Sequence, residues 1–119
     1  MKSIQFLPKQ SYGVATHWSQ VFTLPREALF VGCYDVFVEL DAPFPGGASV
    51  TIDVYESDDR EHFAPTCGAV ITSLDQGGQL ADRTGVKPKP FIKVKAVVAG
   101  SAVTFGVRIQ PHRYDRING

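Results

Sequence analysis

The stretch FIKVKAVVAGSAVTFGVRIQ, residues 91–110, carries the clearest structural signal in the chain. Each half alternates apolar and polar side chains, which is the pattern of a β-strand with one buried face. Gly100-Ser101 lies between the halves and suits a two-residue type II′ turn. If Ala99 pairs with Ala102, every apolar residue of one half faces an apolar residue of the other. The sequence therefore predicts a β-hairpin.

The same register places Lys93 opposite Arg108, with Lys95 further along the polar face. Like charges that face each other are unfavourable unless an acidic group lies alongside. Two explanations are open: a neighbouring strand that carries Asp35 and Glu39, or an acidic partner surface. We favour the neighbouring strand, because surface charge pairs are common and contribute little stability. The three cations are also candidate interface residues.

Further segments show strand patterns between turns rich in Gly and Pro. They are ALFVGCYDVFVELD (28–41), SVTIDVYE (49–56), HWSQVFTL (17–24) and GAVITSL (68–74). In the first, the expected inward residues are Tyr34, Val36, Val38 and Leu40. In HWSQVFTL, the expected common face is Trp18, Gln20, Phe22 and Leu24. The polar stretch 75–90 is expected to be a loop. No segment of useful length has a helical period.

About six to eight short strands predict an all-β fold, an antiparallel β-sandwich or jelly roll. The 119 residues are expected to form one domain, with 1–15 and 111–119 as candidates for extended arms. The tail PHRYDRING could order against a neighbouring subunit. In that case Arg113 and Arg116 would pair with carboxylates, and Tyr114 would serve as an anchor.

Composition narrows the function further. Twelve basic and twelve acidic residues cancel, which argues against nucleic acid as a partner. No run approaches the roughly 20 apolar residues of a membrane span, and no signal peptide is readable. Synthesis in a cytoplasm is therefore expected. Cys33 and Cys67 are too few for a disulfide framework or a metal site. Buried free thiols are favoured over a disulfide between them.

The acidic stretch VTIDVYESDDREHF, residues 50–63, admits three interpretations: a calcium loop, paired catalytic acids, or a polar turn. Glu56, Asp58, Asp59 and Glu61 are expected in the turn after the strand and do not follow the ligand spacing of an EF-hand. Paired catalytic acids must converge on a concave pocket, whereas these lie along one turn. A solvated polar turn is predicted, and a calcium site built from several loops stays open as the alternative.

No other constellation indicates chemistry. His17, His62 and His112 lack the spacing of a metal-binding pair, and no nucleophile elbow, P-loop or dinucleotide fingerprint is present. Cys67 has no histidine near it in sequence, which makes it a weak nucleophile candidate. No catalytic residue, metal or cofactor is expected.

Aromatic side chains offer a different kind of site. Phe37, Tyr55 and Phe91 are expected to lie on an outward sheet face. Such a stripe could bind sugar rings or single-stranded nucleic acid, or form a second buried face. It could also be a protein–protein interface, which is the interpretation we favour.

Three stretches together resemble small virion proteins of tailed bacteriophages. They are LPREALFVGCYDVFVEL (24–40), GGASVTIDVYESDDREHFAP (46–65) and FIKVKAVVAGSAVTFGVRI (91–109). Phage β-sandwich proteins of this length share a strand of the form V-T-I-x-V-x-E-S-x-D, then a turn and F-x-P, and a closing hairpin that turns at A-G-S-A. One departure concerns the turn, where Asp-Gly is expected and Asp59-Arg60 stands. This difference leaves the tightness of the turn open.

The resemblance implies a capsid decoration (cement) protein on the capsid exterior. Its partners would be the major capsid protein and copies of itself, as a dimer or trimer, with neither nucleic acid nor membrane involved. It would stabilise contacts between capsomers. The implied contact residues are Phe37, Tyr55, Arg113, Tyr114 and Arg116, with residues 58–61 as an exposed tip. The alternatives are a phage head–tail or tail accessory protein and a carbohydrate-binding β-sandwich module. An enzyme ranks last.

Overall fold

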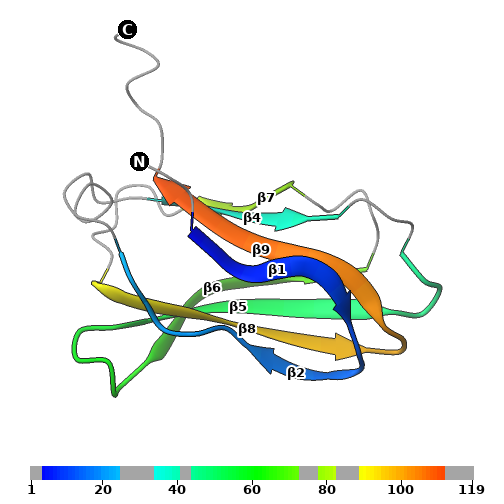
Figure 1. Ribbon diagram of the computed structural model, residues 1–119, viewed down its shortest axis with the longest axis horizontal. Helices are drawn as coiled ribbons and strands as arrows, with labels where there is room; N and C mark the ends of the chain where they lie inside the picture. The colour runs from blue at the N-terminus through cyan, green and yellow to red at the C-terminus, as the bar shows by residue number, and fades with distance from the viewer. Residues whose placement is uncertain (1–3, 25–33, 41–43, 73–77, 83–88, 112–119) are drawn as a thin grey trace, which may run out of the picture.

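The computed structural model describes residues 4–24, 34–40, 44–72, 78–82 and 89–111, which form nine strands and no helix. The strands make two antiparallel sheets that pack face to face (Figure 1). The predicted all-β sandwich is confirmed. Within the described ranges, no helix is long and apolar enough to cross a membrane.

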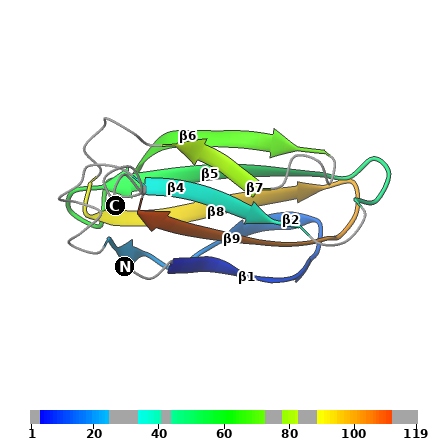
Figure 2. The ribbon, with the colours of Figure 1, turned by 90° about the horizontal axis from the view of Figure 1, so that it is seen from above.

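The first sheet has the strand order β1-β9-β4-β7 and the second sheet has the order β2-β8-β5-β6. The first consists of β1 (Ile4–Tyr12), β9 (Val103–Pro111), β4 (Tyr34–Glu39) and β7 (Gly78–Asp82). The second consists of β2 (Ala15–Trp18), β8 (Phe91–Ala99), β5 (Ser49–Ser57) and β6 (Ala64–Ile71), and β3 (Phe22–Thr23) also pairs with β8. Seen from above, the first sheet lies over the second (Figure 2).

The core lies between the sheets and is built from alternate residues of each strand. Ile52, Val94 and Phe105 are fully buried and come from β5, β8 and β9. Within each of these strands, most of the described residues that alternate with the buried ones point outward and are partly exposed. Ser57 and Gly106 are exceptions and are buried. Burying a side chain such as Val, Ile or Phe stabilises the fold by about 1.5–3 kcal/mol. The apolar alternation of the sequence therefore becomes the sandwich interior.

The predicted hairpin of residues 91–110 is wrong. β8 and β9 do not pair with each other: β8 lies between β2 and β5, while β9 lies between β1 and β4. Their apolar faces meet across the core instead of side by side. The alternation in the sequence is the same in both arrangements, because each strand has one buried face either way. Gly100, with φ of 87°, lies where the chain crosses between the sheets.

Two further sequence predictions need correction. The segment 17–24 is not one strand, because pairing stops after Trp18 and resumes at Phe22. The stretch 75–90 is not all loop, because β7 lies within it and pairs with β4. A polar segment at the edge of a sheet needs no apolar alternation, which explains why its pattern was not recognised.

Other expectations agree with the structure where it describes them. Val36 and Val38 of β4 are buried while Phe37 points outward, and β5 and β6 form strands as predicted. Residues 4–12, expected as part of an arm, pair along β9 and belong to the first sheet. Residues 112–119 lie outside the described chain, as do Cys33 and the side chain of Cys67.

The turn at Gly100 gives a test of this topology. A Cβ at position 100 would overlap the carbonyl oxygen of Gly47 and lie 3.0 Å from the Cα of Ala48. The left-handed backbone there adds strain of about 1–3 kcal/mol for any other residue. We expect Gly100→Ala to lower the free energy of unfolding by at least about 1 kcal/mol, measured by denaturant titration.

Gly13→Ala is the matched control, because nothing lies within 4 Å of a Cβ at that position and its φ is not positive. It should leave the denaturation midpoint nearly unchanged. Equal midpoints for the two variants would contradict the crossing geometry at Gly100.

Candidate functional site

The outer face of the second sheet gathers aromatic and basic side chains from three neighbouring strands. Lys93 of β8 lies beside Tyr55 of β5, and Lys95 lies beside Trp18 of β2 and Asp53 of β5. Residues that are paired across antiparallel strands project to the same side of the sheet. All five side chains therefore share the outward face.

The rings and ammonium groups on this face contact one another. The Nζ of Lys93 lies 4.5 Å from the ring centroid of Trp18 and 4.4 Å from that of Phe63. The Nζ of Lys95 lies 5.6 Å from Trp18 and 5.5 Å from Tyr55. The Trp18 and Tyr55 centroids are 5.3 Å apart, with their planes at 53°. We call Trp18, Tyr55, Phe63, Lys93 and Lys95 the aromatic–lysine face.

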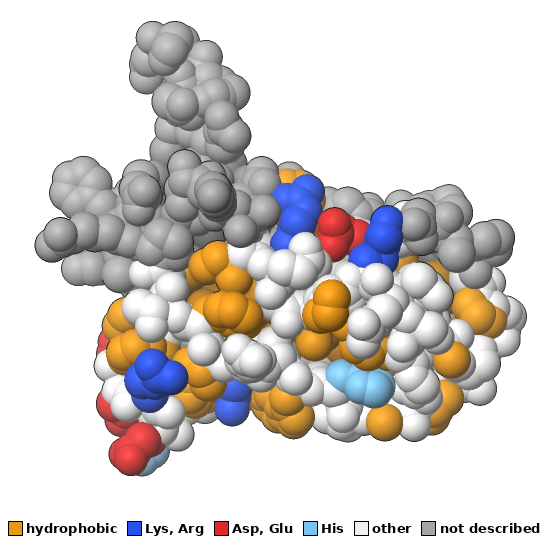
Figure 3. Space-filling model, in the orientation of Figure 1, with side chains coloured by type: hydrophobic (Ala, Val, Ile, Leu, Met, Phe, Trp, Pro, Cys, Tyr) orange, Lys and Arg blue, Asp and Glu red, His pale blue; other side chains and the backbone are white. Residues whose placement is uncertain are grey.

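This face is partly exposed to solvent, and neither of its lysines forms an ion pair with a described residue. Trp18 is 48% exposed, which is unusual for a tryptophan in a folded domain. Within the part of the chain that the structure describes, no carboxylate oxygen lies within 4 Å of the Nζ of Lys93 or Lys95. In the space-filling view, hydrophobic side chains with a few basic ones among them are exposed along the lower part of the molecule (Figure 3).

The outer face of the first sheet has the opposite character. The guanidinium of Arg108 lies 4.5 Å from the ring centroid of Phe37, and its Nε lies 3.7 Å from Oε2 of Glu39. Gln5 donates a hydrogen bond of 2.8 Å to Oε1 of the same carboxylate. The expected acidic neighbour is thus confirmed for Arg108 through Glu39. The side chain of Asp35 is outside the described set.

The residues predicted for an interface are therefore divided between two faces. Tyr55, Lys93 and Lys95 lie together on the second sheet, whereas Phe37 and Arg108 lie on the first sheet. The expected stripe of Phe37, Tyr55 and Phe91 is wrong, because only Tyr55 and Phe91 share a face. Arg113, Tyr114 and Arg116 lie outside the described residues. The expected pair of Lys93 and Arg108 does not form, because the two lie in different sheets.

Sequence reasoning missed Trp18 and Phe63. Trp18 was expected to share one face with Gln20, Phe22 and Leu24, but the strand is interrupted between Trp18 and Phe22. At the break, Ser19 donates its N–H to the carbonyl of Val94 (2.9 Å) and accepts the N–H of Val94 on its hydroxyl (2.9 Å). A serine hydroxyl can replace a backbone acceptor, so Ser19 is the signal in the sequence that marks the break.

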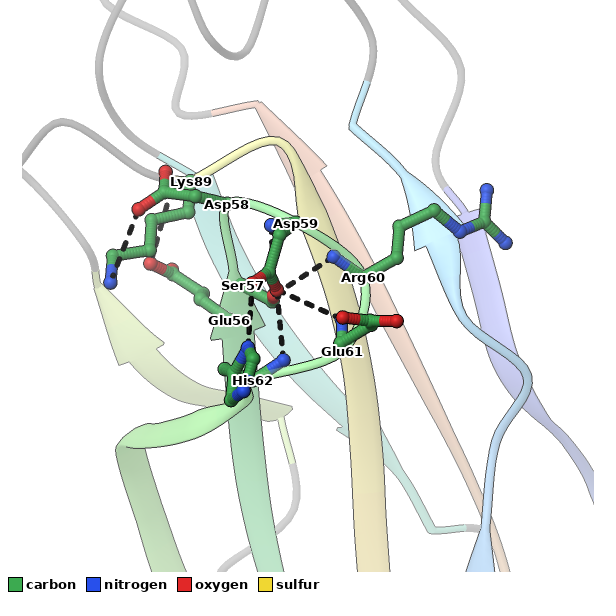
Figure 4. Close-up of polar contacts among 8 residues, drawn as sticks. All are labelled: Glu56, Ser57, Asp58, Asp59, Arg60, Glu61, His62 and Lys89. Atoms are coloured by element: carbon green, nitrogen blue, oxygen red, sulfur yellow. Dashed lines mark hydrogen bonds and ion pairs between the residues drawn. The ribbon is translucent and has the colours of Figure 1, made fainter.

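The acidic stretch after β5 folds into a tight polar turn around Asp59 (Figure 4). Its Oδ1 accepts hydrogen bonds from the Ser57 hydroxyl (2.8 Å) and from the N–H groups of Glu61 (2.9 Å) and His62 (2.8 Å). The Ser57 hydroxyl oxygen in turn accepts the N–H groups of Asp59 (3.1 Å) and Arg60 (3.0 Å). The predicted polar turn is confirmed for residues 58–61, which are exposed, whereas Glu56 was wrongly expected there: it is a buried residue of β5.

Asp59-Arg60 stands where Asp-Gly was expected, so Arg60 occupies the position of the glycine. Its φ is 67°, in the left-handed region that glycine favours. The turn is therefore tight despite the departure from the expected sequence. The guanidinium of Arg60 lies 5.3 Å from the centroid of Phe91, which offsets part of the backbone strain.

Asp59, Glu61 and His62 could each offer one ligand atom to a metal, and these atoms lie within 4.8 Å of one another. All three residues are exposed. The Asp59 carboxylate already accepts the bonds that hold the turn, including a contact of 2.6 Å between its Oδ2 and Nδ1 of His62. We assign no metal to this cluster.

The hydrogen bonds that Asp59 accepts also stabilise its ionised form. The N–H and ring of His62, followed by the N–H of Glu61 and the hydroxyl of Ser57, hold the pKa of Asp59 well below its usual value. The Asp58 carboxylate next to it lies 3.6 Å from Nζ of Lys89.

No family model matches the chain, and no curated protein matches it.

The Asp59 turn predicts a pH dependence of stability. A carboxylate whose pKa is depressed on folding stabilises the fold above its ordinary pKa near 4, and this contribution is lost as the pH falls. Asp59→Asn should therefore be less stable than the natural chain at neutral pH. Its stability should also fall less steeply between about pH 5 and pH 2. Thermal unfolding followed across this range measures both effects.

Glu61→Gln is the control, because only the backbone N–H of Glu61 takes part in the turn. Its pH profile should match that of the natural chain. If Asp59→Asn also matched the natural profile, Asp59 would not be the group that stabilises the turn.

Proposed function

We propose that this chain is a structural protein of a tailed-phage virion, a capsid decoration protein that docks on the outer capsid surface. The observation that supports this proposal best is the aromatic–lysine face, where a half-exposed Trp18 lies among further rings and two ammonium groups on one side of the sandwich. Trp and Tyr are the residues that most often anchor protein–protein contacts. The partner is the major capsid protein, and the docked copies stabilise contacts between capsomers.

The geometry of the rings favours a protein partner over a sugar. A sugar that stacks on two aromatic rings requires them to share a plane, whereas Trp18 and Tyr55 are inclined at 53°. Lys93 also lies over the ring of Trp18 at 4.5 Å and would compete with a stacked ligand. A carbohydrate-binding module is therefore the weaker hypothesis.

The two outer faces differ in a way that selects one for docking. Arg108 on the first sheet is paired with Glu39, so a partner would gain little there. Lys93 and Lys95 on the second sheet form no ion pair with any residue that the structure describes. Because a decoration protein binds in many copies, each contact can be modest and still stabilise the whole shell.

Trp18→Ala tests the docking face. A tryptophan at the centre of an interface contributes about 2 kcal/mol or more, so we expect at least a thirtyfold loss of affinity. The probe is the shell assembled from the major capsid protein encoded in the same genome, and the measurement is co-sedimentation over a range of concentrations. Trp18 is half exposed, so the variant should keep its unfolding midpoint.

Phe37→Ala is the matched control, since it removes an aromatic side chain from the outer face of the first sheet. It should sediment with the shells as the natural chain does. If Phe37→Ala lost binding and Trp18→Ala kept it, the docking face would be the other one. If the natural chain did not bind shells but bound a glycan array, the decoration function would give way to the carbohydrate module.

A further inference from the structure

We propose that the surface bound by the aromatic–lysine face is an extended acidic segment of a protein, with carboxylates at alternate positions. This inference rests on the proposed function, in that it takes this face as the docking surface. It adds the chemistry of the partner.

The two lysines of the face form no ion pair with the described residues. Two ammonium groups lie side by side, and no carboxylate of the described residues lies within 4 Å of either. Asp53 is the neighbour of Lys95 across the strands, yet it does not form this ion pair. The acidic turn has other contacts, since Asp58 pairs with Lys89 and Asp59 with His62. Among the described residues the two ammonium groups are therefore not used in an ion pair, and a carboxylate of a partner can approach them.

The spacing of the two lysines along β8 matches that of alternate residues in an extended partner segment. Lys93 and Lys95 are alternate residues of one strand, so their Cα atoms lie about 7 Å apart. Acidic residues at positions i and i+2 of an extended segment have the same separation. Such a segment, laid along β8, would bring one carboxylate to each ammonium group.

Aromatic rings hold the ammonium groups in position. Lys93 lies between the rings of Trp18 and Phe63, at 4.5 Å and 4.4 Å from their centroids. A lysine that is held over rings loses less conformational entropy on binding than a free one. The rings therefore orient the cations and add apolar contact area beside them.

The lysines on Trp18 disfavour ligands that bind by stacking, such as nucleotide bases. A nucleotide base that binds by stacking needs the open face of a ring. On Trp18 both lysine ammonium groups lie within 5.6 Å of the ring centroid. Next to the rings lies an apolar row, Val97 and Val70 on either side of Thr51, with Val70 55% exposed. Carboxylates together with apolar side chains match this surface better than a phosphate backbone with bases does.

The single tryptophan of the chain reports directly on this site. The probe is an acetylated and amidated octapeptide of alternating Glu and Thr, and the control peptide replaces each Glu by Gln. We expect the Glu peptide to shift the Trp18 emission in a saturable manner and the Gln peptide to leave it unchanged. Binding should weaken as salt rises from about 0.01 M to 1 M, since the Debye length falls from about 30 Å to 3 Å.

Matched variants assign the effect to the two cations. Lys93→Met and Lys95→Met keep the apolar stem and remove the charge, and each should weaken the Glu peptide roughly two- to fivefold. Arg108→Met on the opposite face is the control and should not change the affinity. If neither Lys variant differed from the natural chain, the proposed contact would be refuted.

Four other outcomes would overturn the inference. Equal binding of the Gln peptide, or no saturable shift with the Glu peptide, would remove the role of the carboxylates. Tighter binding of an oligothymidylate of similar length would identify the anion as phosphate. A shift that depends on protein concentration alone would mean that a second copy covers the face.

The peptide experiment tests the acidic partner, and the co-sedimentation experiment tests the decoration function, so each proposal can be refuted without the other. If the Glu peptide bound as expected but capsid shells did not co-sediment, the decoration function would be wrong and the acidic partner would stand. If shells bound through Trp18 regardless of the two lysine charges, the function would stand and the acidic segment would not.

Discussion

The alternation of side chains along each strand is the constraint on which the rest of the structure depends. Ile92, Val94 and Ala96 of β8 are fully buried against the first sheet. Because a strand has a period of two, Lys93 and Lys95 have no position except the outer face. The basic character of that face is therefore a consequence of core packing. Its aromatic character depends on which strands lie beside β8.

The same alternation explains how much of the fold could be predicted from the sequence. Alternation is a property of one strand at a time. The buried faces of β5, β8 and β9 were therefore predictable from the apolar residues at every second position, such as Val50 in β5 and Phe105 in β9. It does not specify the partner of a strand. Residues 91–110 are equally suited to a hairpin and to two strands that face each other across a core. The structure separates these arrangements through non-local contacts, such as the close approach of Gly100 to Gly47, two residues that are distant in sequence.

The candidate site shows the same division between local and non-local information. Tyr55, Lys93 and Lys95 were predictable, because each lies on the polar side of a regular strand. Trp18 was not, because Ser19 interrupts the strand and the apparent alternation with Phe22 runs across the break. Phe63 lies beyond the Asp59 turn, and its contact with Lys93 depends on how tightly that turn closes. Arg60 in a left-handed conformation shows that the closure is tight.

Stability and binding are separable in this arrangement. The buried side chains hold the sheets together, and the outward side chains of β8 contribute little to that association. An exposed cation–π contact is worth about 0.5–1 kcal/mol, which is small beside the burial of one core side chain. Loss of the Lys93 or Lys95 charge should therefore leave the fold intact. On the first sheet the charge of Arg108 is used within the chain, through Glu39. On the second sheet Lys93 and Lys95 are held over rings, and neither forms an ion pair with a described residue, so their charges contribute little to the stability of the fold.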